Sequence, residues 1–387
     1  MHMEIITKDA HKALLKRMLH DGAAPDFIRI SAELSAEAEI RMRNPLYSVT
    51  FTKSRAVSGD PHDFYTEAPY WWPDPANPGG PFIRRDGEYY PERMDTHRRH
   101  LTALSDDVYI LSIAGFLFDR QDCIDRAKTL LETWFLDPAT KMNPHLEYAQ
   151  AISGITDGRG IGIIDTAALI RLISAMDYFT LCPGTSDTVA GLREWFAAYL
   201  TWLDTSKKGI EEREYPNNHS SWWTAQAAAY AAFIGDEAML QRCFTRLTER
   251  ILPRQTREDG SFINEMERTR SLFYSLFNLN ACAVTAEIAH NRGVDLWNAV
   301  CEGGRGIPKS LAFYHPYYEN PLLWTHRQIN YENPGVNIAF QLAAVRVSDA
   351  YDRVNTIRRE GYRFFALPGH LGAPCMLEGY FPTQSSQ

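Results

Sequence analysis

The sequence predicts an all-α protein whose helices form an (α/α) toroid, or incomplete barrel, with a long aromatic-rich loop over its cleft. Apolar residues recur at three- and four-residue steps in one segment after another, which is the pattern of packed helices. The links between these segments are short and carry Gly, Pro or Asp. Strand signals are scarce, and no repeat of fixed length indicates a solenoid. An irregular helical bundle is the alternative architecture.

The helical segments follow one another along most of the chain. We expect helices over residues 8–19, 30–42, 102–119, 123–136, 163–179, 189–204, 220–234, 238–252, 272–290 and 337–350. Several are apolar on most faces, which an inner helix of a toroid requires because it packs on two sides. We assign residues 1–387 to a single toroid domain, with N-terminal helices over 1–44, a loop over 45–100 and the helical barrel over 101–387.

The interruption of the helical pattern, residues 53–100, is rich in Pro, Gly, Asp and aromatic side chains. A structureless stretch of this length inside a compact domain is either functional or disordered. Because disordered segments are poor in aromatic residues, we expect an ordered loop over one mouth of the barrel. Its ring and imidazole side chains suit a sugar-binding rim, with His62, Tyr70, Trp71 and Trp72 as the candidates. The alternative is a flap that only closes the barrel.

Composition excludes several classes of partner. The formal net charge of −8 argues against a nucleic-acid ligand. An anionic ligand would then need a local cluster of Arg, His and Asn side chains. No apolar run approaches the ~18 residues of a membrane span, and the N-terminus lacks the apolar core of a signal peptide. We expect no membrane partner, a monomer or homodimer, and a cytoplasmic location, or a periplasmic or secreted one if a leader was removed.

The cysteines and histidines give no sign of a metal site. The six cysteines lie apart, without a CxxC pair, and are expected to be buried free thiols. No HExxH occurs, and the histidines are too dispersed to indicate zinc. The sequence also lacks a GxGxxG after a strand, a Walker A motif and a GxSxG elbow. We expect no metal.

The first segment that could carry chemistry is YPNNHSSWW, residues 215–223. The Asn pair favours a turn, and Ser220 or Ser221 can cap the helix that follows. Asn217, Asn218 and His219 are then expected at a helix N-terminus, where backbone N–H groups favour an anion. The alternative is that the Asn pair is turn chemistry and that His219 is only a satisfied polar residue.

A second segment, residues 263–282, combines arginines with a tyrosine. Arg270 and Tyr274 are four residues apart and are expected to share a helix face. Arg268 would reach the same point only from a non-helical entry to that helix. A tyrosine beside a cation has its phenolate favoured, as a tyrosine base requires. The alternative is a surface salt-bridge patch with a half-buried tyrosine.

Two further segments collect polar groups. Residues 142–166 place polar side chains at a helix junction with Gly for close approach: Asn143, His145, Gln150 and Arg159. Residues 313–330 are expected to form an aromatic, Pro-broken loop with His315, Trp324, His326 and Gln328.

Four motifs together resemble the alginate-lyase-type polysaccharide lyases, a family with an α/α toroid fold. They are HDFYTEAPYWWPDP, GRGIGIIDT, NNHSSWW and ERTRSLFY, and the likeness extends from about residue 45 to 350. In the better-known alginate lyases the tyrosine follows the arginine by seven residues, but position 277 is Phe here. The ERTR…Y form is similar to a branch associated with glucuronan or alginate cleavage.

The resemblance implies a lyase that acts on a 4-linked uronic-acid polymer without a required cofactor. It assigns the catalytic roles to Asn218, His219, Tyr274 and an arginine that is either Arg268 or Arg270, of which we take Arg268. The residues expected to bind the polysaccharide or oligosaccharide are Asn217, Gln150, Arg159, Arg270, His62, Tyr70, Trp71, Trp72, His315 and Trp324.

The chemistry of such a cleavage fixes what each residue would do. The carboxylate of the sugar must be neutralised before its C5 hydrogen can be removed, which Asn218, an arginine and His219 could do. Tyr274 as phenolate or His219 as imidazole would take the C5 proton, and Tyr274 would give a proton to the leaving O4. If both groups lie on one ring face, Tyr274 can do both; if they lie on opposite faces, His219 is the base. The product carries a 4,5-double bond.

Two other functions fit the same fold. A glycoside hydrolase on an α/α barrel would need a pair of carboxylates, and no spacing in the sequence singles one out. A carbohydrate-binding protein that has lost its chemistry would bind sugar without forming product.

Overall fold

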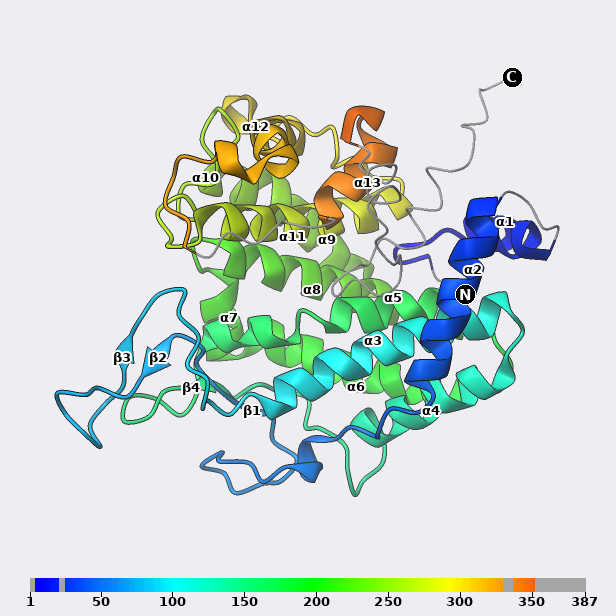
Figure 1. Cartoon of the computed structure of the whole chain (residues 1–387), viewed down its shortest axis with the longest axis horizontal. Helices are drawn as coiled ribbons and strands as arrows, with labels where there is room; N and C mark the ends of the chain where they lie inside the picture. Colours follow the sequence, from blue (N-terminus) through cyan, green and yellow to red (C-terminus); the bar gives the residue numbers. More distant parts are fainter. Residues whose placement is uncertain (1–3, 21–24, 330–336, 352–387) are drawn as a thin grey trace.

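The computed structural model describes residues 4–20, 25–329 and 337–351, which form two layers of helices (Figure 1). The inner helices pack each against the next, in the order α3 (Thr96–Leu117), α5 (Leu169–Phe179), α8 (Asn218–Ile234), α11 (Ser271–Asn291) and α13 (Ile338–Arg346). The outer helices pack against them: α4 (Gln121–Phe135), α6 (Ser186–Thr205), α9 (Glu237–Arg246) and α12 (Ile307–Glu319). The predicted all-α toroid is confirmed.

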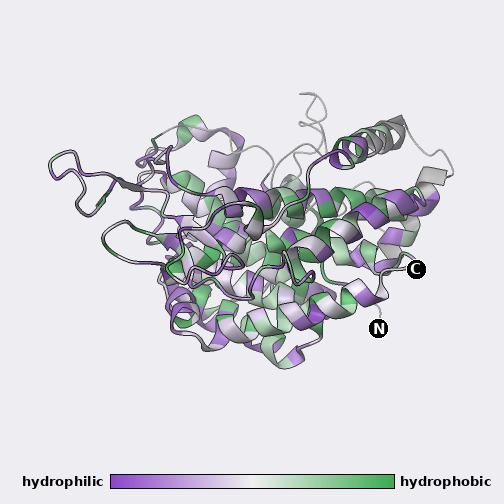
Figure 2. Cartoon of the chain, turned by 90° about the horizontal axis from the view of Figure 1, so that it is seen from below, coloured by the Kyte–Doolittle hydropathy of each residue, from purple (hydrophilic) through white to green (hydrophobic). Residues whose placement is uncertain are grey.

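Inner and outer helices differ in the way their sequences predict. Along α8 nearly every side chain is buried, and its run of alanines lets neighbouring helices approach on both sides. Gly235, with φ 84°, ends α8 in the left-handed conformation that glycine adopts without strain. In α4 the buried residues recur at helical spacing and leave a polar face toward solvent, which Figure 2 shows as alternating colours along the outer helices.

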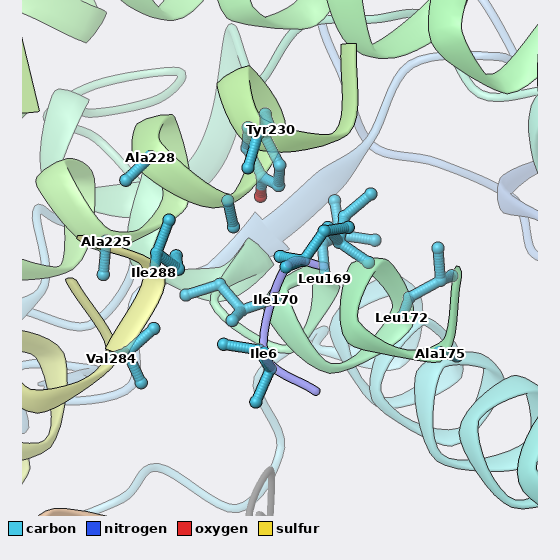
Figure 3. Packing of buried hydrophobic residues seen from close by; sticks show 14 of the residues in the cluster. Ile6, Leu169, Ile170, Leu172, Ala175, Ala225, Ala228, Tyr230, Val284 and Ile288 are labelled. Carbon is cyan, nitrogen blue, oxygen red and sulfur yellow. The ribbon is translucent and has the colours of Figure 1, made fainter. Parts of the chain in front are cut away.

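The inner helices begin at one end of the molecule. The first turns of α3, α8 and α11, and the residues just before α5, line one cleft. These helices then run toward the opposite end, where the N-terminal segment enters the space between them. Figure 3 shows Ile6 among apolar side chains of α5, α8 and α11, including Ile170 and Val284. The lumen of the toroid is therefore filled at this end.

A buried carboxylate holds the N-terminal segment in place. Asp177, on α5, accepts hydrogen bonds from the backbone N–H groups of Ile5 (2.7 Å), Ile6 (2.8 Å) and Thr7 (2.9 Å). From α11, the amide of Asn291 donates to the Ile5 carbonyl (3.1 Å). Complete burial raises the pKa of Asp177 to about 6 although these donors and Lys12 favour its charged form.

The predicted loop over 45–100 is structured and lies at the cleft end (Figure 1). It contains β1 (Tyr65–Glu67), which pairs in parallel with β4 (Tyr148–Ala151). It also contains an antiparallel pair, β2 (Trp71–Trp72) and β3 (Ile83–Arg84). These short pairs anchor the aromatic segment beside the first turns of the inner helices.

The N-terminal helices α1 (Asp9–His20) and α2 (Pro25–Arg41) both pack against α3, near the predicted ranges. Elsewhere some boundaries were wrong. Helix α3 begins six residues before the predicted 102–119, because its first turns are charged and carry no apolar period. The predicted helix over 238–252 is α9, followed by a π-helical turn (Leu247–Ile251) and α10 (Leu252–Gln255).

Two helices were missed. The short α7 (Lys207–Arg213) had no apolar pattern to predict it. Part of the expected loop over 313–330 is the end of α12, which accommodates Pro316 inside the helix at the loss of a backbone donor. The described cysteines are free thiols as predicted, although Cys182 and Cys301 are only partly buried, and Cys375 lies outside the described residues. Helix α11 is long and apolar enough to cross a membrane, but 83% of its apolar window is buried inside the protein, as in a core helix.

Candidate active site

A cleft of about 440 Å³ opens where the inner helices begin. One wall comes from the loop, with Tyr70, Trp71 and Tyr89, and another from α8 and α11, with His219 and Tyr274. The polar and charged residues that line it are Thr66, Glu67, Arg84, Arg93, Asp95, Arg98, Gln150, Arg159, Asp165, Tyr215, Asn217, Asn218, His219, Arg268 and Tyr274. The cleft thus brings together side chains that are up to about two hundred residues apart in the sequence.

His219 lies in the first turn of α8, behind its N-cap residue Asn217. Its Nδ1 is 3.0 Å from Oε1 of Glu212, a carboxylate on α7 with no exposed surface. A buried carboxylate favours the tautomer with its proton on Nδ1, which leaves the Nε2 lone pair available. Nε2 has no partner within the described part of the chain. Burial raises the pKa of Glu212, and contact with His219 opposes this.

Asn218 is held by a second buried carboxylate. Its backbone N–H and its side-chain Nδ2 both donate to Oε1 of Glu265, at 2.7 and 2.8 Å. The sequence predicts that backbone N–H groups at this helix start receive an external anion, but Glu265 occupies that position instead. The predicted cap was also wrong: Asn217, not a serine, caps α8 by accepting from the N–H of His219. One Nδ2 hydrogen of Asn218 remains for a ligand.

Tyr274 lies in the first turn of α11, with its hydroxyl hydrogen-bonded to that of Tyr70 from the loop. The guanidinium of Arg268 lies over its ring, 3.8 Å from the centroid. Burial raises the pKa of Tyr274, and the opposing effect of Arg268 does not cancel this. The cation does favour the phenolate, as expected, but burial outweighs it, so the pKa of Tyr274 stays above its ordinary value and the phenol keeps its proton.

Arg268 is in turn fixed by Asp86 of the loop. Its Nε and Nη2 donate to the two carboxylate oxygens at 3.2 and 2.9 Å. Burial alone would raise the pKa of Asp86, but hydrogen bonds from Arg268 and Thr269 hold it at about 2. This pair directs the guanidinium onto Tyr274 and leaves Nη1 of Arg268 available at the cleft.

The far wall of the cleft is a network around Gln150, at the end of β4. Asp165 accepts from Thr66 (2.6 Å) and from Nε2 of Gln150 (2.9 Å). The amide oxygen of Gln150 thereby faces Arg159, whose Nη2 donates to it at 2.7 Å. Gln150 has φ 51°, a left-handed conformation that costs a non-glycine residue energy and is concentrated at functional sites.

The cleft is locally positive although the chain is acidic overall. Five arginines (Arg84, Arg93, Arg98, Arg159 and Arg268) line it together with three carboxylates (Glu67, Asp95 and Asp165). The N-termini of four inner helices add partial positive charge at the same end. This is the local cluster that an anionic ligand was predicted to need.

A family model described as alginate lyase matches residues 48–324. The chain belongs to the alginate lyase family. As a member it is a polysaccharide lyase, and the resemblance seen in its motifs is confirmed. Comparison with the curated proteins found no match.

Solved structures share the fold of this lyase over most of its chain. An alginate lyase from Bacteroides ovatus superposes with a TM-score of 0.84 at 29% identity, covering 99% of this chain and 100% of that one. A complex of alginate lyase A1-III with a tetrasaccharide gives 0.57 at 15% identity, covering 88% of each chain. Alginate lyase A1-III from Sphingomonas species A1 gives 0.51 at 16% identity, covering 85% and 87%. The last two show the fold alone.

Several residues predicted for the site of this lyase line the cleft: Asn217, Asn218, His219, Arg268, Tyr274, Gln150, Arg159, Tyr70 and Trp71. Arg270 does not. It precedes α11, and its guanidinium stacks on Phe273 at 4.2 Å. The prediction that Arg270 shares a helix face with Tyr274 is therefore wrong, because Arg270 lies outside the helix. Arg268 reaches Tyr274 from the non-helical segment before α11.

Other predicted binding residues also lie outside the cleft lining. The Nδ1 of His62 contacts the Lys141 carbonyl at 2.6 Å, and Trp72 donates to the Glu88 carbonyl at 3.0 Å. His315 packs on α12 against Tyr351, and the buried Trp324 donates to Ser271 at 2.9 Å. These side chains contact other segments of the protein. An aromatic and polar segment is as typical of such packing as of a sugar-binding surface.

Other residues of the site had no local signal. Glu212 and Glu265 are ordinary acidic residues of helical or turn segments, and only burial beside His219 and Asn218 distinguishes them. Tyr89 of the loop and Arg98 in the first turn of α3 line the cleft, and Asp86 of the loop fixes Arg268. Within the described ranges, no cluster of three or more His, Cys, Asp or Glu side chains is arranged to hold a metal ion.

Proposed function

We propose that this lyase cleaves a 4-linked uronic-acid polymer, alginate or glucuronan, by β-elimination in the cleft. The observation that carries the proposal is that His219 and Tyr274 line the same cleft. The imidazole has a free nitrogen backed by Glu212, and the phenol keeps its proton. A base and an acid at one site are what removal of a proton and departure of an oxygen require.

The negative charge of the sugar carboxylate must first be neutralised, so that the C5 hydrogen can be removed. A negative charge beside the carbon that is deprotonated opposes formation of a carbanion-like transition state. The free Nδ2 hydrogen of Asn218 and the Nη1 of Arg268 are the donors that would neutralise it. Both side chains are already fixed by buried or paired carboxylates, so little reorganisation accompanies binding.

The proton transfers then follow from the free nitrogen of His219 and the phenol of Tyr274. The Nε2 of His219 takes the C5 proton, the electron pair forms the C4–C5 double bond, and the C4–O4 bond breaks. Tyr274 gives its proton to the departing O4. Burial raises the pKa of Tyr274 and so favours it as the acid, and His219 is the base where the C5 hydrogen and O4 lie on opposite ring faces.

Support for a polymeric uronate also comes from relatives. One of the A1-III structures is a complex with a tetrasaccharide, and a Tyr-to-Phe variant of that enzyme is likewise a tetrasaccharide complex. A hydrolase is disfavoured, since the three carboxylates that line the cleft are engaged: Asp165 by Thr66 and Gln150, Glu67 by Arg55, and Asp95 by Arg93 and Arg99.

A screen of polymannuronate, polyguluronate and glucuronan tests the proposal. Elimination creates a conjugated unsaturated uronate that absorbs in the ultraviolet, whereas hydrolysis creates only reducing ends. We expect absorbance to rise with at least one polymer, and Tyr274→Phe to lower kcat by ~10²-fold or more with its fold intact by circular dichroism. Reducing ends without absorbance, or full activity of folded Tyr274→Phe, would overturn the mechanism.

A further inference from the structure

A second depression in the surface lies between α7, α8 and α9, and the mechanism above does not use it. Its volume is about 590 Å³, against about 440 Å³ for the cleft. One wall is formed by α9 and the π-helical turn that follows it, and the other by the end of α7. We call it the outer groove, and its charged lining residues are Arg213, Glu214, Arg242, Arg246, Glu249 and Arg250.

The outer groove and the cleft lie at the same end of the toroid. Helix α8 begins at the cleft, and Arg246, at the end of α9, donates from Nη2 to Oγ of Ser220 in the first turn of α8 at 3.0 Å. Consecutive residues of the segment that joins α7 to α8 line the two depressions, Glu214 the groove and Tyr215 the cleft. Only this short segment separates them, so a polymer that extends past Tyr215 can continue into the groove.

The outer groove collects more guanidinium groups than carboxylates, so that single carboxylate oxygens serve two arginines. Arg213 and Arg242 both donate to Oδ1 of Asp204, at 2.9 and 2.6 Å. Arg213 and Arg246 both donate to Oε1 of Glu214, at 3.0 and 3.3 Å. The acidic side chains of this region are therefore fully used by three of the four arginines.

The fourth arginine, Arg250, is exposed and lines the groove without a hydrogen bond or ion pair in the part of the chain that the structure describes. Glu249 is the next residue on the same helical turn, and it makes no such contact with Arg250 either. Burial lowers the pKa of Arg246, and repulsion from Arg213 and Arg250 lowers it further. The positive charges of the groove thus repel one another, and a bound anion would relieve this repulsion.

We propose that the outer groove is a second binding site for the uronate polymer, outside the catalytic cleft, and that the enzyme therefore acts better on long chains than on short ones. This inference rests on the proposed function and adds a second place of contact for the same substrate. Guanidinium groups bind carboxylates through charge-assisted hydrogen bonds. A chain held at two places dissociates less readily than a chain held at one, because the second site keeps it near when the first releases it.

The test compares two substrates, the polymer that the screen shows to be cleaved and the shortest oligosaccharide of it that the enzyme still cleaves. The variant is Arg250→Glu, which reverses an exposed charge of the groove. Loss of the second site is expected to raise KM for the polymer by about tenfold. KM for the oligosaccharide, which occupies the cleft alone, should change by less than about twofold. Circular dichroism confirms that the variant is folded.

The matched control is Arg254→Glu. Arg254 lies on α10, is exposed like Arg250 and does not line the groove, so its reversal changes the net charge by the same amount. KM for the polymer should stay within about twofold in this variant. A second readout needs no turnover: with His219→Ala as the background, calorimetric titration with the polymer should show binding that is about tenfold weaker with Arg250→Glu and unchanged with Arg254→Glu.

Three results would overturn the assignment of the outer groove. They are an unchanged KM for the polymer in Arg250→Glu, an equal rise of KM on polymer and oligosaccharide in that variant, and an equal rise of KM for the polymer in Arg254→Glu. In each case the unaltered enzyme still forms unsaturated product, so the proposed function stands. If no uronate polymer gives unsaturated product, the proposed function fails and the assignment of the groove fails with it.

Discussion

The two ends of the toroid use buried carboxylates in opposite ways. At the filled end, the carboxylate of Asp177 accepts hydrogen bonds from three backbone N–H groups of the N-terminal segment and so holds that segment in the lumen. At the cleft end, Glu212 and Glu265 each hold a side chain that faces the substrate, and each keeps one oxygen, Oε2, without a hydrogen-bond partner in the structure. The same chemical group therefore serves stability at one end and the positioning of reactive groups at the other.

The comparison predicts that substitutions at the cleft end lower activity with little change in stability, and that substitutions at the filled end change stability with little change in activity. The largest effect is expected for His219→Ala, which removes the base at the cleft end. We expect kcat to fall by ~10²-fold or more while the midpoint of thermal unfolding changes little. Initial rates of ultraviolet absorbance on the cleaved polymer measure the first quantity. A folded His219→Ala with near-normal kcat would assign the base to another residue.

Glu212→Gln tests whether the carboxylate behind His219 tunes the base. Removal of the negative charge disfavours the protonated imidazole, so the acid limb of the kcat/KM profile should move to lower pH, and kcat should fall about tenfold or more. Glu265→Gln is the control at the same end, since it contacts Asn218 and not the imidazole. An acid limb that stays in place in Glu212→Gln would reduce Glu212 to a packing role.

Asp177→Asn tests the filled end through the pH dependence of stability. The folded-state pKa of Asp177, about 6, exceeds the ordinary value of about 3.9, so the folded protein binds this proton first as pH falls. The contribution of Asp177 to the free energy of unfolding should therefore decrease as pH rises from about 4 to about 6 and stay constant above. Denaturant titrations of both proteins measure it.

The difference between the two stability curves isolates this residue from other titrating groups. In Asp177→Asn the slope between those pH values should be less negative, and kcat per folded molecule should match that of the unaltered enzyme. Parallel curves for the two proteins would mean that Asp177 titrates normally.

The smallest effect is expected for His315→Ala, since His315 packs on α12 away from the cleft lining. KM and kcat should both stay within about twofold of the unaltered values, as for most surface substitutions away from a site. A large rise in KM would place substrate at α12 and revise the extent of the binding surface.

Helical periodicity predicted most inner and outer helices, because each buries one face or its whole circumference and therefore shows a pattern of apolar residues. The wrong predictions fall on segments that lack such a pattern. The charged first turn of α3 faces the cleft, and α7 is short and polar. Pro316 was read as a loop residue because a proline inside a helix is costly, but α12, which packs on α11, contains it.

The residues of the site could be predicted where turn-forming residues come directly before a helix. The Asn pair placed His219 at the beginning of α8, and the Arg-rich entry placed Arg268 within reach of Tyr274. The groups that fix these side chains were not predictable. Asp86 meets Arg268 across 182 positions of sequence, and such a meeting depends on how the loop packs and not on any spacing.

The acidic surface and the positive cleft act on a polyanion over different distances. Far from the protein, the net charge of −8 repels the polymer, and salt at physiological strength confines that repulsion to about 8 Å. Inside the cleft, helix ends and partly desolvated guanidinium groups attract it with much weaker screening. Added salt should therefore first speed capture of the polymer and slow it only at higher concentration, so that an acidic enzyme can work on an acidic polymer.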